Sequence, residues 1–133
     1  MEIHIPYQQL YKREPDFIVS YEIDPCEEIK HTKACQGMRV DFKYDSDGPE
    51  SRLVYMIWPE LLDKEGKVIK EITPGIMDSS GLANMWVLNP DMRAYHTNRI
   101  TVGEKGYWVI GPYRLANVLV TQIGSLKNLK GEK

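Results

Sequence analysis

The sequence has little of several features that would point to a particular class of protein. Its 133 residues include only two cysteines and no apolar run near eighteen residues, so neither a dense disulfide framework nor a membrane-spanning helix is predicted. The first residues lack the apolar core of a secretory signal, and a cytoplasmic location is therefore expected. An excess of positive charge is also missing, since 17 basic residues stand against 19 acidic ones. This balance argues against a protein that works mainly by neutralising nucleic-acid phosphates.

Motifs for catalysis are missing as well. No Gly-x4-Gly-Lys-Ser/Thr loop occurs, so no bound nucleotide is expected, and the segment 79–81 lacks the glycine frame of a nucleophile elbow. No amphipathic stretch of helical period is longer than two turns. A single globular domain of ordinary composition remains, and we predict no cofactor for it.

What the sequence does contain is short runs in which apolar and polar residues alternate. In the stretch 30–44, apolar residues occupy every second position from Met38 to Tyr44, and Gly37 before them fits a bend or a positive φ. Further strands are predicted at 17–23, 53–58, 82–88, 107–110 and 113–123. Several short strands separated by turn residues predict an all-β barrel or sandwich.

The remaining segments divide the chain into three parts. Residues 1–16 form a predicted N-terminal arm, with enough apolar side chains to dock as a short strand or a helical turn. Residues 17–124 form the β-domain, and residues 125–133 form a lysine-rich tail. Within the domain, Pro59 is predicted to end the third strand, and residues 91–98 are predicted to be a loop.

Two separated stretches resemble the C-terminal β-barrel domain (domain III) of translation elongation factor Tu. Residues 30–42 are similar, without a gap, to the family pattern Arg-His-Thr-Pro-Phe-x-x-Gly-Tyr-Arg-Pro-x-Phe. The identical positions are His31, Thr32, Gly37, Arg39 and Phe42. Residues 107–123 resemble the closing hairpin, in which a Gly-Gly-Arg turn precedes a valine-rich strand. The resemblance implies a six-stranded antiparallel β-barrel, which in the full factor contacts the T-stem of aminoacyl-tRNA.

The resemblance also implies an RNA- or tRNA-binding surface, whose basic residues here would be Lys30, His31, Lys33, Arg39 and Arg114. Asp41 departs from this pattern, because it replaces a polar neutral residue and would repel phosphate. The arginine of the turn falls at Tyr113, with Arg114 one place later and on the opposite face. The GTPase domain of that factor has no counterpart in the sequence. We therefore expect a non-catalytic binding module for another protein, with RNA or tRNA binding as the alternative.

A small hydrolase is a third interpretation of the sequence. It would use His96 or His31 with a carboxylate within hydrogen-bond reach, such as Asp91 or Glu104. No nucleophile stands beside either histidine in a recognisable pattern, and a loop histidine is usually only polar. We therefore predict that the protein is not an enzyme.

The two cysteines, the histidines and the tryptophans have further interpretations. Cys26, His31 and Cys35 could hold a metal with His4 or His96, but their spacing lacks the Cys-x2–4-Cys knuckle of structural zinc sites. Both cysteines are expected to be reduced thiols in the cytosol. The tryptophans would fill the core or an interface, or would line a ligand site; they are Trp58, Trp86 and Trp108.

Overall fold

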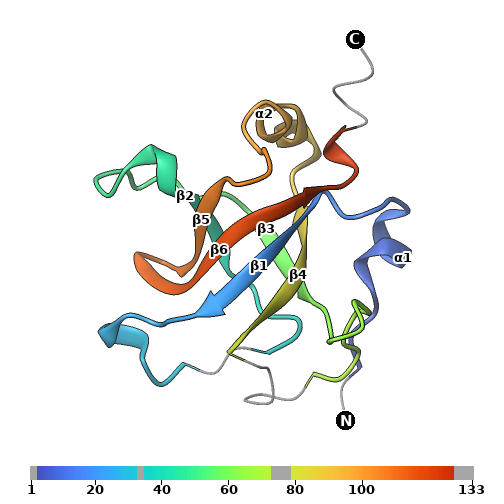
Figure 1. The fold of residues 1–133 in the computed structure, drawn as a ribbon, viewed down its shortest axis with the longest axis horizontal. Helices are drawn as coiled ribbons and strands as arrows, with labels where there is room; N and C mark the ends of the chain where they lie inside the picture. The colour runs from blue at the N-terminus through green and yellow to red at the C-terminus, as the bar shows by residue number, and fades with distance from the viewer. Residues whose placement is uncertain (1–2, 33–34, 73–78, 128–133) are drawn as a thin grey trace.

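The computed structural model describes residues 3–32, 35–72 and 79–127. They form a six-stranded antiparallel sheet that curls into a half-barrel, with few helices (Figure 1). The strands are β1 (Phe17–Ile23), β2 (Asp41–Tyr44), β3 (Ile57–Leu61), β4 (Ser80–Val87), β5 (Lys105–Ile110) and β6 (Tyr113–Ile123). The helices are α1 (Tyr7–Tyr11) and α2 (Arg93–Thr97), with 3-10 turns η1 (Glu27–Ile29), η2 (Asp45–Asp47) and η3 (Pro90–Met92). No helix in these ranges is long and apolar enough to cross a membrane.

The strand order in the sheet is β2-β5-β6-β1-β4-β3, and every neighbouring pair is antiparallel. The predicted six-stranded antiparallel architecture is therefore confirmed at the level of a curled sheet. β1 lies in the middle, between β4 and β6, whereas β2 and β3 are the two edge strands.

The gap between β2 and β3, here called the seam, is crossed at two places. Phe42 and Tyr55 exchange both backbone hydrogen bonds, each 2.9 Å long. The buried side-chain amide of Gln36 donates to the carbonyls of Leu61 and Ile69 and accepts from the Leu61 N–H at 2.7 Å. One side chain thus replaces backbone partners that a neighbouring strand would supply.

The core follows from the alternation in the strands. Phe17, Val19 and Tyr21 of β1 point inward, as do Phe42 and Tyr44 of β2, and all five are buried. The predicted bounds of β1 and β6 are confirmed, and the predicted strands at 82–88 and 107–110 correspond to β4 and β5. The prediction for the turn before β2 is also confirmed, because Gly37 has a φ of 86°.

The predicted strand at 53–58 is wrong, because Pro59 lies inside β3 instead of ending a strand before it. On either side of β3, the carbonyl of Met56 accepts a hydrogen bond from the Leu88 N–H, and the N–H of Leu62 donates to the carbonyl of Leu82 in β4. In β3, every second backbone nitrogen, including that of Pro59, points toward the seam and away from β4. The missing N–H of proline is tolerated there, since an edge strand needs no ladder bond on its open side.

Two other predictions need correction. The predicted strand at 38–44 is shorter and begins at Asp41, although Val40 before it is buried. The predicted loop at 91–98 contains part of η3 and all of α2. A five-residue helix such as α2 is too short to show a clear helical period in the sequence.

The N-terminal segment contacts the sheet domain through backbone hydrogen bonds. Ile3 forms an isolated bridge with Glu71, and α1 follows after Pro6. Its helix ends at Lys12, which adopts a left-handed conformation with φ 57°. Outside the described residues lie Pro74-Gly75, a pair that predicts a turn, and residues 128–133 of the tail.

Candidate functional site

The register of the strands places a set of polar side chains on the outer face of β2, β5 and β6. Lys43 stands opposite Tyr107, and Tyr107 stands opposite Asn117. Two residues further along β5, Val109 stands opposite Asp41 of β2 on one side and opposite Arg114 of β6 on the other. The side chains of Lys43, Tyr107 and Asn117 point away from the core, because the residues that alternate with them are buried, whereas Val109 is itself buried.

The chain after η2 forms a second wall beside this face. Together they line a cleft of about 970 Å³, which we call the hairpin cleft because Gly111 and Pro112 of the turn between β5 and β6 contribute to its lining. Its charged side chains are Lys43, Arg52, Arg114, Asp45 and Glu50. Its apolar surface comes from two valines and two prolines, which are Val54, Val109, Pro49 and Pro112.

The charges of the hairpin cleft are unevenly paired. Among the described residues, Lys43 and Arg52 form no ion pair, whereas Arg114 approaches Asp24 at 3.4 Å. The carboxylate of Asp45 accepts a 2.5 Å hydrogen bond from the phenol of Tyr107, and this bond raises the pKa of that phenol. The cleft can therefore hold an anionic group beside an apolar surface.

The predicted RNA-binding residues are placed as follows. Lys30 pairs with Glu27 at 2.8 Å, and His31 is exposed after η1. Arg39 reaches across the seam and lies over the ring of Trp58, 5.2 Å from its centroid. Only Arg114 lines the hairpin cleft.

Lys33 lies outside the described residues, and no contact in the described part of the chain joins Arg39 to the other three. RNA binding by this set stays a prediction. The sequence analysis did not single out Tyr107, Arg52 or Val54, which line the cleft. Strand alternation could have placed Tyr107 beside Lys43, but no local signal shows that residues 48–54 fold back over β5.

No protein-family model and no curated protein matches this chain. The resemblance to domain III of elongation factor Tu therefore stays a prediction. The function has to be inferred from the arrangement of the side chains themselves.

A second cluster of ionisable groups lies beside the cleft, between β2 and α2. The phenol of Tyr44 and Nδ1 of His96 are 2.7 Å apart, and both side chains are buried. Burial and the nearby Arg99 guanidinium lower the pKa of His96 to about 4, while burial raises the pKa of Tyr44. At neutral pH the imidazole is thus uncharged, and it shares a hydrogen bond with the neutral phenol of Tyr44.

Arg99 connects this cluster to the wall of the hairpin cleft. Its guanidinium donates to Asp47 and Ser46 of η2 and to the phenol of Tyr95, each at 2.9 Å. It also lies over the ring of Tyr44, 3.7 Å from the centroid. The hydrogen bonds from Tyr55 and Arg99 lower the pKa of Tyr95. Arg99 thereby fixes η2, which begins with the cleft residue Asp45.

The surroundings of His96 differ from those of a catalytic base. Its ring packs against Tyr44, Tyr55 and Tyr95, and no carboxylate in the described ranges bonds to it. Glu104, one of the proposed partners, instead accepts a hydrogen bond from Ser46 at 3.0 Å. A neutral, covered imidazole is suited to packing and hydrogen bonding.

The cysteines and tryptophans also have defined positions. No group of three His, Cys, Asp or Glu side chains among the described residues is close enough to hold a metal. Cys26 and Cys35 are both free thiols. Trp86 and Trp108 are fully buried, as predicted for packing residues, and Trp58 is half-buried beneath Arg39.

Proposed function

We propose that this protein is a non-catalytic binding module, and that the hairpin cleft holds an acidic and partly apolar peptide segment of a partner protein. The observation that carries the proposal is the position of Lys43 and Arg52. These two cations lack ion-pair partners in the described part of the chain and lie beside Val54 and Val109 in one cleft.

Each part of the cleft matches one feature of such a peptide. The guanidinium of Arg52 can bind a carboxylate through two parallel hydrogen bonds, and Lys43 adds a positive charge. Val54 is 40% exposed, and its burial by an apolar side chain would contribute about 1 kcal/mol. The volume of about 970 Å³ leaves room for several peptide side chains.

The acidic residues of the cleft favour a peptide over RNA. Asp45 and Glu50 line the cleft, and Asp41 stands opposite the cleft residue Val109 on the neighbouring strand. An RNA strand carries a phosphate at every nucleotide and would meet these carboxylates, whereas a peptide can space its acidic side chains. The near balance of charge over the whole chain agrees with this preference.

We also propose that the half-barrel is related to the closed six-stranded barrel of domain III of elongation factor Tu. The two links across the seam, the Phe42–Tyr55 bridge and the Gln36 side chain, support this relation. In this proposal the hairpin cleft belongs to this chain and is not a shared feature of the two barrels.

The test is fluorescence anisotropy with three labelled probes: a peptide of alternating Glu and Leu, the same peptide with Gln for Glu, and a single-stranded RNA. We expect the Glu–Leu peptide to bind, and the Gln peptide to bind roughly five- to tenfold more weakly. The double variant Lys43→Glu/Arg52→Glu should lose the binding. Lys64→Glu is the matched control, because Lys64 lies in the exposed turn at 63–66, apart from the residues that line the cleft.

Two outcomes would overturn the proposal. If the Glu–Leu peptide binds the double variant as well as the wild type, the hairpin cleft is not the site. If the RNA binds more tightly than the peptide, with a steep salt dependence that the double variant loses, the protein is an RNA-binding module instead.

A further inference from the structure

The outer face of β3 and β4 carries a second set of side chains that would suit a binding site. Trp58 stands opposite Trp86, and Glu60 stands opposite Asn84. These residues alternate with the core residues of β4, so they point outward. Glu60, Asn84 and Trp86 are nevertheless buried, because the part of the N-terminal arm before Lys12, residues 3–11, covers them. We call this covered surface the arm groove.

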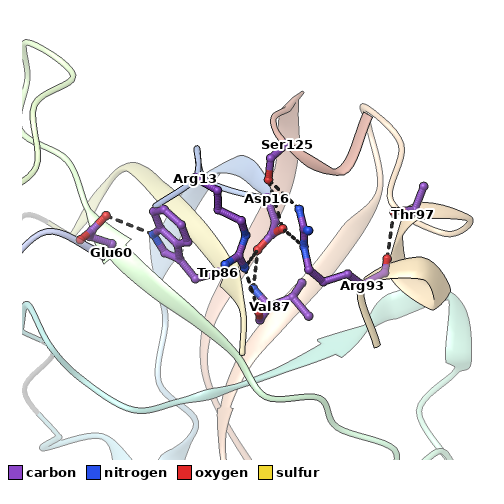
Figure 2. A network of polar contacts seen from close by, with 8 residues as sticks. All are labelled: Arg13, Asp16, Glu60, Trp86, Val87, Arg93, Thr97 and Ser125. Atoms are coloured by element: carbon purple, nitrogen blue, oxygen red, sulfur yellow. Dashed lines mark hydrogen bonds and ion pairs between the residues drawn. The ribbon is translucent and has the colours of Figure 1, made fainter. Parts of the chain in front are cut away.

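The carboxylate of Glu60 is the centre of the arm groove. One of its oxygens lies 2.5 Å from Nε2 of His4 and accepts a 2.8 Å bond from the backbone N–H of Tyr7. The other accepts from the indole N–H of Trp86 at 3.1 Å, as Figure 2 shows, and from Asn84 at 3.4 Å. The arm and the groove thus supply half of these contacts each.

The rest of the arm lies on Trp86. The rings of Tyr7 and Tyr11 lie 6.0 and 5.7 Å from the ring of Trp86, measured between centroids. The arm therefore binds the arm groove through hydrogen bonds to Glu60 and ring contacts with Trp86.

The opposite side of the arm is apolar and uncovered. Ile3, Ile5 and Leu10 are 66%, 56% and 55% exposed, so their own domain does not bury them. Three large apolar side chains on one short segment are available to a neighbouring molecule.

The arm ends at a hinge that carries backbone strain. Lys12 is the only residue other than glycine with a positive φ in the described ranges, and its value of 57° disfavours an ordinary side chain. Directly after the hinge the chain is fixed to its own domain, because Arg13 donates to the carboxylate of Asp16 at 2.9 Å and to the carbonyl of Val87 at 3.1 Å (Figure 2). The buried carboxylate of Asp16 in turn bonds to Arg93, Ser125 and the N–H of Val87. An extended conformation at Lys12 would release the strain and carry the arm away from its own domain.

We propose that two copies of this chain exchange their arms, so that the arm of each occupies the arm groove of the other. The exchanged and the closed forms make the same contacts with Glu60 and Trp86, and they differ at the hinge. Exchange relieves the strain at Lys12, and this gain acts against the entropy of association. This surface is distinct from the hairpin cleft, so the proposal does not depend on the proposed function.

The first test is the molar mass in solution by size-exclusion chromatography with light scattering, over about a hundredfold range of concentration. We expect a monomer–dimer equilibrium. Lys12→Gly removes the strain of the closed form and should weaken the dimer by roughly five- to thirtyfold for each arm. Lys12→Val cannot adopt the closed hinge easily and should strengthen the dimer. A monomer at every concentration for both the wild type and Lys12→Val would overturn the proposal.

The second test separates arm exchange from a dimer that forms by another surface. Ile3 and Glu71 are bridge partners, so Ile3→Cys and Glu71→Cys place two thiols at a distance that a disulfide can span. Cys26 and Cys35 are changed to Ser to prevent disulfide exchange. Oxidation at a concentration where the protein is dimeric should give a covalent dimer on a non-reducing denaturing gel. A covalent monomer under the same conditions would show that each arm stays on its own domain, and it would overturn the proposal.

Discussion

Three buried polar side chains, Gln36, Glu60 and Asp16, each join segments that are far apart in the sequence. Gln36 links the chain before β2 to β3 and to Ile69. Glu60 links β3 to the arm, and Asp16 links the start of β1 to the chain near α2 and after β6. Their polar atoms are paired, which is what makes their burial compatible with a stable fold.

Gln36→Ala should destabilise the protein by about 1–3 kcal/mol, because it removes the partners of the Leu61 N–H and the Ile69 carbonyl and one of the two donors to the Leu61 carbonyl. Urea unfolding followed by circular dichroism measures this loss. Gln122→Ala makes the same chemical change on the exposed surface of β6 and should alter the stability by less than about 0.5 kcal/mol. Equal effects of the two substitutions would show that the seam does not need the Gln36 amide.

At the scale of the elements, regular strands could be predicted from the sequence and irregular ones could not. The alternation in β1 and β6 gave their bounds, because one face of each strand is buried along most of its length. β3 was missed because its proline is tolerated at an edge, and being an edge strand is a property of the whole sheet. The helix α2 was missed because its position depends on packing between His96 and the tyrosines.

The hairpin cleft was predictable only in part, because one of its walls is an irregular segment. Arg114 was named from the resemblance, and the alternation from Met38 to Tyr44 implies that Lys43 points outward. Arg52 and Val54 come from an irregular segment, whose return over β5 depends on long-range contacts such as Arg99 with Asp47. Local patterns in the sequence contain no information on such contacts.

The packing of α2 has a consequence for stability at low pH. The pKa of His96 is about 4 in the folded protein, below its ordinary value of 6.5. Between these two values the unfolded chain binds a proton that the folded protein does not, so stability decreases as the pH falls. The contribution of this one group should reach roughly 3 kcal/mol at the lower end of that range.

Urea unfolding of the wild type and of His96→Gln, at neutral pH and at about pH 4.5, measures this contribution. The glutamine cannot take up the proton, so the variant should lose less stability over the interval than the wild type. Arg99 and Asp16, which also act on His96, are present in both proteins. The same loss in both proteins would contradict a buried, neutral His96.

At the scale of the whole molecule, the two surfaces lie on different parts of the curled sheet. The hairpin cleft is on the outer face of β2, β5 and β6, and the arm groove is on the outer face of β3 and β4. β1 lies between these two groups of strands and pairs with both β4 and β6. The arm can therefore open without breaking any pairing within the sheet, and substitutions at one surface should leave the other unchanged.

The arm should consequently open at a lower free energy than the sheet unfolds, and native-state hydrogen exchange in increasing urea can measure both. The amide of His4, bonded to the Lys70 carbonyl at 2.7 Å, should exchange by a local opening that urea hardly affects. Amides in the middle of β1 should exchange only by global unfolding. Lys12→Gly should slow the exchange at His4 by about fivefold, because the closed hinge is then unstrained. If His4 and the β1 amides share one free energy and one urea dependence, the arm unfolds only with the sheet, and its exchange between molecules would require global unfolding.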